Sequence, residues 1–164
     1  MIAVRSGTAP LDPQLQADFE EKYGIPILID YGATESGGVC CWTLPLHKEF
    51  AKAKRGSVGR AVAGVQIRVR DQDSGELIDD GSMGILEVSV EGKTDGWVAT
   101  TDLVALDEDG FLYIRGRSDD AIVRGGFKVL PDDVARVLRQ HPLVADVAVV
   151  GIDCRFPGAP DKDA

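Results

Sequence analysis

The sequence predicts a mixed α+β fold: the end of an α/β layer, then a small antiparallel β-barrel-like subdomain, then the start of a small α/β domain. Three observations support this order. A capped helix and a short apolar strand come first, alternating strands divided by turns begin at Ser57, and a helix pattern returns at Pro131. The predicted domains are residues 1–118, with the β-rich part at about 55–118, and residues 119–164.

The first predicted helix begins at the pair Asp12-Pro13, which is typical of an N-cap and a first turn, and ends before Gly24. Apolar residues recur in it every four positions, at Leu15, Phe19 and Tyr23. The next segment, Ile25–Asp30, is short, apolar and β-branched, so we expect a buried strand. Loops at the C-terminal ends of such strands bind ligands in α/β folds, and here the glycine-rich segment Tyr31–Gly38 follows.

The middle of the chain predicts a small twisted antiparallel sheet or partial barrel. In Val65–Arg70 apolar and charged residues alternate, which is typical of a half-buried strand. Three more strands are predicted at Ile85–Val90, Trp97–Thr101 and Phe111–Arg115. The run Asp107–Gly110 predicts the hairpin turn before the last of them.

A second unit is predicted after the polar segment Gly116–Asp120. Its helix opens at Pro131 and ends before Pro142, and Val144–Val150 predicts a strand. The tail Phe156–Ala164 has no apolar periodicity, so we expect this unit to be cut off before its sheet is complete.

Composition excludes several classes of function. The net charge of −9 disfavours a surface that follows nucleic-acid phosphates, so we expect no nucleic-acid partner. The three cysteines lack metal-site spacing, which favours a reducing compartment. There is no apolar run of the roughly 18 residues that a membrane helix needs, and no signal-peptide core, so the expected localisation is cytoplasmic.

The glycine-rich segment has the residue types of a phosphate and magnesium site. Gly32 lets backbone approach a ligand, the Thr34 hydroxyl can donate to a phosphate oxygen, and the Glu35 carboxylate can hold Mg²⁺, which prefers oxygen ligands. Taken alone, such a segment is also an ordinary turn.

Asp102, at the end of a predicted strand, is a second candidate. An ionised carboxylate accepts two hydrogen bonds at once, which suits the paired 2′ and 3′ hydroxyls of a ribose, and the donor fork of Arg117 would suit the same sugar or a phosphate. The alternatives are a turn or cap role for Asp102 and an exposed turn for Arg117.

Taken together, the motifs resemble the ANL superfamily of adenylate-forming enzymes, which includes acyl-CoA synthetases, peptide-synthetase adenylation domains and luciferases. The resemblance extends to about Ile152. The segments that carry it are Tyr31–Glu35, Gly56–Arg60, Thr100–Leu103, Gly110–Ile114, Gly116–Asp120 and Gly125–Pro131.

The resemblance implies a role for each matched position. On the nucleotide side, Tyr31 would stack on adenine beside Gly32, and Asp102 and Arg117 would bind the ribose. Thr34 would meet the AMP phosphate, and Glu35 would hold Mg²⁺. Asp119 would be the hinge of a small mobile domain, in which Gly126 would line the pantetheine route of CoA and Lys128 would match a basic position. A solvated lysine at a strand end is the alternative for Lys128. The implied ligands are ATP or AMP, Mg²⁺, CoA and a carboxylic acid.

The chain departs from the family pattern at several points. The phosphate-binding loop would lie upstream of Met1 and the catalytic lysine beyond Phe156–Pro160, and neither Lys93 nor Lys162 has a matching context. We therefore expect a fragment that is inactive in isolation, because the charge on the α-phosphate has little compensation. Two smaller departures are Thr101, where the family has glycine, and Ala135, where an acidic residue is frequent.

The implied function of the parent protein is ATP-dependent ligation of a carboxylic acid to CoA through an acyl-adenylate. The alternatives are a non-catalytic nucleotide-binding or interaction module and an adenylation domain that loads a carrier protein. From this chain, only Gly37–Trp42 would contribute to an acyl pocket. Apolar faces exposed by truncation would favour self-association.

Overall fold

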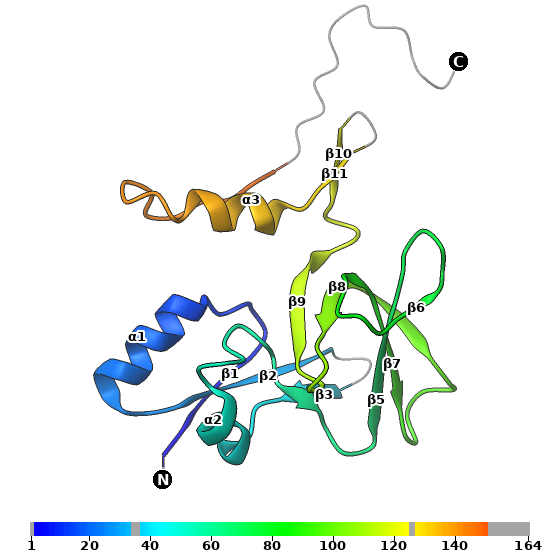
Figure 1. The fold of residues 1–164 in the computed structure, drawn as a ribbon, viewed down its shortest axis with the longest axis horizontal. Helices are drawn as coiled ribbons and strands as arrows, with labels where there is room; N and C mark the ends of the chain where they lie inside the picture. The colour runs from blue at the N-terminus through cyan, green and yellow to red at the C-terminus, as the bar shows by residue number, and fades with distance from the viewer. Residues whose placement is uncertain (1, 34–36, 125–126, 151–164) are drawn as a thin grey trace, which may run out of the picture. The chain divides into compact units, whose positions relative to one another are not determined.

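The computed structural model describes residues 2–33, 37–124 and 127–150. The chain divides into two compact units, Met1–Asp119 and Asp120–Ala164. The first unit contains two helices, a four-stranded sheet and a five-stranded antiparallel sheet (Figure 1). The predicted mixed α+β class is therefore confirmed.

Helix α1 (Pro13–Tyr23) has the bounds that its caps predict. The Asp12 carboxylate accepts hydrogen bonds from two backbone N–H groups of the first turn, and Gly24 ends the helix at a φ of 64°. The apolar residues of the four-residue spacing do not form the buried face: Leu15 and Tyr23 are 60% and 55% exposed, while Gln16 is buried. Gln16 faces the interior because its side-chain amide donates to Glu20 and to the Ile27 carbonyl oxygen.

The four-stranded sheet has the order β1-β2-β3-β4, and only the β1–β2 pair is parallel. Its strands are β1 (Val4–Ser6), β2 (Ile27–Ala33), β3 (Gly37–Cys41) and β4 (Arg60–Ala61). Buried residues of β2, Ile27 to Ile29, confirm the predicted apolar strand. However, β2 continues to Ala33 and pairs with β3, which begins at Gly37, so the described residues at both ends of the glycine-rich segment lie in paired strands.

A short helix that the sequence analysis did not predict, α2 (Leu44–Phe50), follows β3. The Thr43 hydroxyl caps it by accepting the Leu46 N–H.

The five-stranded sheet confirms the predicted antiparallel β-rich region. In the order β6-β5-β7-β8-β9, its strands are β6 (Leu77–Ile78), β5 (Val65–Arg70), β7 (Gly84–Val90), β8 (Val98–Leu106) and β9 (Leu112–Arg117). The Asp107 carboxylate organises the predicted β8–β9 turn by accepting the backbone N–H groups of Asp109 and Phe111.

The two sheets of the first unit are joined through the segment Gly56–Arg60. The backbone of Val58 donates to the Leu112 carbonyl at 2.8 Å, and Leu112 donates back to Gly59 at 3.0 Å. One apolar core packs residues of β3 against the five-stranded sheet, and a second contains Leu28, Ile29, Trp42 and Phe111. The strand pair β2–β3 is therefore fixed against β7, β8 and β9.

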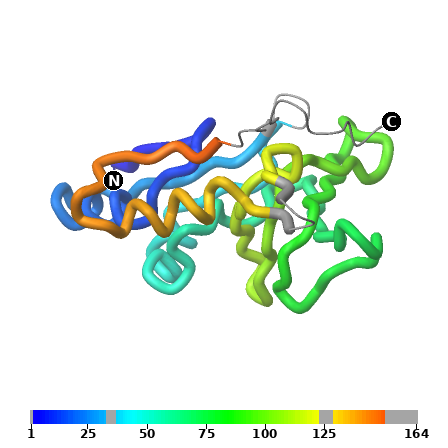
Figure 2. Tube along the Cα trace, turned by 90° about the horizontal axis from the view of Figure 1, so that it is seen from above, coloured from blue at the N-terminus to red at the C-terminus, as the bar shows by residue number. Residues whose placement is uncertain are grey.

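The described residues of the second unit contain the antiparallel strand pair β10 (Ile122–Arg124) and β11 (Phe127–Val129), followed by helix α3 (Pro131–Leu138), which is gold in Figure 2. The helix begins at the predicted Pro131. The strand predicted over Val144–Val150 is wrong, because that segment is irregular. A strand needs a hydrogen-bonded neighbour, and β10 and β11 pair with each other. Within the described residues, no helix has the length and apolar character needed to cross a membrane.

Candidate functional site

The candidate site is centred on a contact between the two sheets of the first unit. The Tyr31 hydroxyl, from β2, donates a hydrogen bond to the Asp102 carboxylate, from β8. Both side chains are partly buried. Burial and the hydrogen bond to Asp102 raise the pKa of Tyr31, and the positive charge of Arg117 lowers it by a smaller amount. An aromatic ring, a carboxylate and a guanidinium are thus brought into one neighbourhood.

Asp102 is held in place by its backbone as well as by Tyr31. Its N–H donates to the Thr100 hydroxyl at 3.1 Å, and that hydroxyl donates to the Leu86 carbonyl on β7, also at 3.1 Å. Across the ladder, Asp102 is in register with Arg117 of β9. The carboxylate therefore projects from a rigid strand, and this restricts the positions at which it can accept hydrogen bonds.

Thr101, which replaces the glycine of the family motif, fits the strand without distortion. It is exposed in the middle of β8, and its carbonyl accepts the Ser118 backbone N–H at 2.7 Å and the Ser118 hydroxyl at 3.1 Å. A β-branched residue is favourable in such a position. Threonine at this position is therefore compatible with the strand that carries Asp102.

Arg117 forms a two-pronged ion pair with Asp119. Its Nε donates to one carboxylate oxygen at 2.9 Å and a terminal nitrogen donates to the other at 2.7 Å. This contact lowers the pKa of Asp119, since the guanidinium favours the ionised carboxylate. Both side chains are about half exposed, with 52% and 49% accessible. Asp119 is the last residue of the first unit.

Gly32 lies where two strands approach too closely for a side chain. A Cβ at this position would be 2.1 Å from the Gly37 carbonyl oxygen. The β2–β3 register also shifts between Tyr31 and Gly32. Glycine is therefore required to bring Tyr31 into its position at the sheet junction.

Four other predicted site positions have no described side chain. Thr34, Glu35 and Gly126 lie outside the described residues. The backbone of Lys128 belongs to β11, but its side chain is not described. The roles of these four residues stay predictions, including the magnesium contact of Glu35.

Lys93, which lacks the sequence context of the family's catalytic lysine, nevertheless lies near the site. The Lys93 ammonium, from the loop between β7 and β8, lies 2.6 Å from the point where a Cβ on Gly37 would be. It therefore lies against the glycine-rich segment. Only the three-dimensional fold brings these residues together, so no spacing rule would have found this contact.

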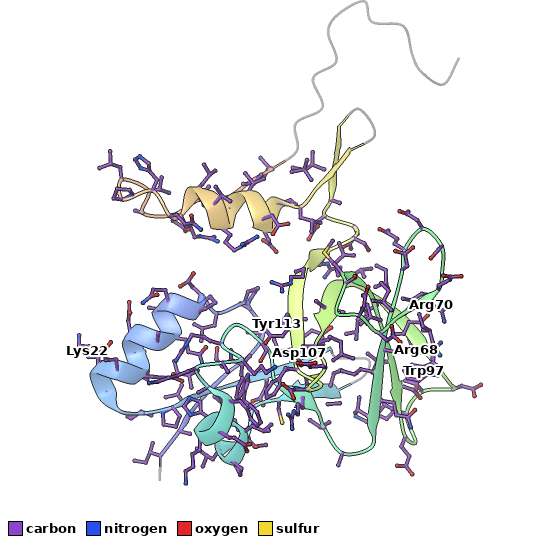
Figure 3. All side chains as sticks on the ribbon, in the orientation of Figure 1. Lys22, Arg68, Arg70, Trp97, Asp107 and Tyr113 are labelled. Atoms are coloured by element: carbon purple, nitrogen blue, oxygen red, sulfur yellow. The ribbon has the colours of Figure 1, made fainter. Side chains whose placement is uncertain are left out.

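A second polar cluster, on the β-rich region, is structural in character. Arg68 and Arg70 both donate to the buried carboxylate of Glu87, at 2.5 and 2.9 Å, and Arg68 stacks 4.1 Å from the Trp97 ring (Figure 3). The Glu87 carboxylate offsets part of the positive charge of the two arginines within the sheet, and Glu87 is in register with Arg68.

The chemistry of the site matches nucleoside binding. The Asp102 carboxylate can accept hydrogen bonds from adjacent hydroxyls, the Tyr31 ring offers an aromatic face, and Arg117 supplies donors. In the described part of the chain, no three His, Cys, Asp or Glu side chains form a metal cluster.

Comparison with known proteins gives a consistent assignment. Residues 2–97 match the AMP-binding enzyme family. The chain is 39% identical over 165 residues to the long-chain-fatty-acid–CoA ligase FadD15 of Mycobacterium tuberculosis, covering 96% of this chain and 26% of that protein. It is 32% identical over 169 residues to the 2-succinylbenzoate–CoA ligase of Bacillus subtilis, covering 93% of this chain and 33% of that protein.

Solved structures show the same fold. ATP-bound MatB from Rhodopseudomonas palustris aligns with a TM-score of 0.77 and 30% identity, over 92% of this chain and 32% of that one. The O-succinylbenzoate coenzyme A synthetase MenE from Bacillus subtilis, in complex with ATP and magnesium ion, aligns with a TM-score of 0.75 and 27% identity, over 93% and 34%.

The chain spans about a third or less of the length of these relatives. The family match nevertheless covers more than half of this chain, and the fold aligns with that of a solved relative over 92% of this chain. The chain therefore belongs to the AMP-binding enzyme family of adenylate-forming acyl-CoA ligases.

Proposed function

We propose that this chain supplies the adenosine-binding part of an ATP-dependent ligase that activates a carboxylic acid as an acyl-adenylate and transfers the acyl group to CoA. The observation that carries this proposal is the Tyr31–Asp102 contact, which places an aromatic ring and a strand-held carboxylate together where two sheets meet. CoA, rather than a carrier protein, is the proposed acceptor because the relatives FadD15 and MenE are named for CoA ligation.

In this proposal Asp102 accepts the two ribose hydroxyls, and Tyr31 packs its ring on the adenine. Because Tyr31 now donates to Asp102, nucleotide binding must share or replace that hydrogen bond. Thr34 and Glu35 would meet the phosphate and Mg²⁺. Magnesium, when bound, would neutralise negative charge on the phosphates. Gly126 and Lys128 would contribute to the CoA side of the reaction.

The 164 residues alone are proposed not to catalyse exchange of pyrophosphate into ATP. The phosphate-loop and catalytic-lysine motifs of the family are not among them, so the developing negative charge has too few compensating cations. Carboxylate-dependent exchange by the purified chain would contradict this part of the proposal.

The nucleotide assignment is tested by calorimetric titration of the purified chain with AMP. We expect weak binding, because much of the adenosine remains open to water in a chain that spans about a third of its relatives. Asp102→Asn keeps the size of the side chain and removes its charge, so the affinity should fall by about tenfold, the loss of one charge-assisted hydrogen bond.

The matched control is Asp79→Asn, the same change at an exposed acidic residue between β6 and β7. It should leave the affinity for AMP unchanged. Equal affinities for the wild-type, Asp102→Asn and Asp79→Asn proteins would remove Asp102 from the site, and submicromolar binding would contradict the open, partial cradle.

A further inference from the structure

We propose that Asp119 competes with the nucleotide for Arg117. Occupation of the nucleotide site would then break the Arg117–Asp119 ion pair, here called the clamp, at the end of the first unit. This inference rests on the proposed function and deepens it, because it assigns Asp119 as a positioning residue for Arg117. It is carried by the two-pronged ion pair, in which Nε and one terminal nitrogen of Arg117 are both directed at the Asp119 carboxylate.

The geometry of the guanidinium explains the competition. Arg117 can present a two-donor edge to only one acceptor group at a time in a given orientation, and Asp119 now occupies the edge that includes Nε. Arg117 is also the residue in register with Asp102, and its charge acts on Tyr31. To donate with this edge to a ribose on Asp102, the guanidinium must turn away from Asp119.

The position of Asp119 gives the competition a structural consequence. The strand β9 ends at Arg117. The next residue, Ser118, is held to β8 because its backbone N–H and its hydroxyl both donate to the Thr101 carbonyl. Asp119 is the next residue and the last of the first unit. Its carboxylate therefore ties the end of the first unit back to β9 while Arg117 donates to it.

The strength of the clamp is suited to a reversible role. Ion pairs between half-exposed side chains contribute little to stability, although a forked arginine–carboxylate pair contributes more than most of them. A ligand that binds Arg117 can therefore displace Asp119. The cost of displacement should appear as a two- to fivefold weakening of nucleotide binding, roughly the effect of one such pair.

The test compares AMP affinity in four purified proteins by calorimetry: the wild type, Asp119→Asn, Arg117→Ala and the double variant. Asp119→Asn should bind AMP about two- to fivefold more tightly than the wild type, because Arg117 no longer has to leave a charged partner. In the Arg117→Ala background the same change should have no effect. Asp120→Asn removes a neighbouring negative charge without removing the fork, and it should change affinity less than Asp119→Asn.

Hydrogen–deuterium exchange supplies a second readout that a purely structural ion pair would not change. AMP should slow exchange near Asp102 and quicken it over 119–121 in the wild type, and the quickening should disappear in Asp119→Asn. If Asp119→Asn tightens binding equally with and without Arg117, or if it does not tighten binding at all, the competition is refuted while the nucleotide site stands. If none of the proteins binds AMP, the proposed function itself fails.

Discussion

Replacing Gly59 with alanine should destabilise the first unit strongly, because this glycine permits a very close backbone approach at the junction of the two sheets. Its φ is +90°, and a Cβ would lie 2.2 Å from the Cys41 carbonyl oxygen and 2.7 Å from the Trp42 nitrogen. Both obstacles are backbone atoms of β3 and the residue after it, so they cannot turn aside as a flexible side chain would.

The expected loss has two parts. The left-handed conformation costs alanine about 1 kcal/mol relative to glycine. Relieving a 2.2 Å contact also requires the segment to move away from β3, which weakens the 2.8 Å and 3.0 Å hydrogen bonds that join it to Leu112, at about 1 kcal/mol each. Gly59→Ala should therefore lower the free energy of unfolding by about 3 kcal/mol.

Gly75→Ala is the matched control, since Gly75 has a φ of +72° and, among the described residues, no neighbouring atom within 4 Å of the point where a Cβ would lie. It should cost only the conformational part, about 1 kcal/mol. Urea titrations monitored by tryptophan fluorescence measure both variants, because Trp42 is buried beside the substituted segment. Equal losses for the two variants would refute the close-approach argument.

Three further predictions concern single side chains. Tyr31→Phe keeps the aromatic ring but removes the donor to Asp102, so the free energy of unfolding should fall by about 1–2 kcal/mol in urea titrations. The affinity for AMP should change by less than about threefold. A larger loss of affinity would mean that the hydroxyl itself contacts the nucleotide. Burial raises the pKa of the Cys40 thiol from 9.0 to about 12, so iodoacetamide should leave it unmodified at pH 8 until the protein unfolds. The thiol should also contribute stability that is complete below pH 9.0 and falls as pH rises towards about 12, and alkaline denaturation that is unchanged in Cys40→Ala would contradict this. The pKa of Glu20 lies below its ordinary 4.5, because hydrogen bonds to its carboxylate from neighbouring groups outweigh the effect of burial. The ionised Glu20 carboxylate therefore stabilises the fold above pH 4.5, and this contribution is lost as pH falls below that value. The difference in stability between the wild type and Glu20→Gln should shrink as pH falls, and a constant difference would contradict the assignment.

Local signals in the sequence were sufficient for much of the fold. The caps of α1 and the turn at Asp107 were predicted correctly because each depends on hydrogen bonds within a few residues. Helix α2 was missed because its seven residues are too few to show apolar periodicity, although Thr43 as N-cap and Pro45 in the first turn mark its start.

The errors arose where packing overrides pattern. The four-residue apolar spacing in α1 located the helix but not its buried face, which is set by the hydrogen bonds of Gln16. Apolar composition predicted a strand at Val144–Val150, but a strand forms only beside a partner. The Tyr31–Asp102 contact joins residues 71 positions apart, and its prediction depended on the family resemblance rather than on spacing.

Binding of adenosine between β2 and β8 can be measured by nuclear magnetic resonance titration of the ¹⁵N-labelled protein with AMP. At AMP concentrations up to about 10 mM, enough to detect weak millimolar binding, amide shifts should change at Tyr31, Gly32, Asp102 and 116–119 and should saturate with one dissociation constant. The Asp102→Asn protein should show smaller changes at the same AMP concentration. No saturable shifts at these residues, or saturable shifts confined to the β5–β7 face that carries Arg68 and Glu87, would contradict the assignment of the site.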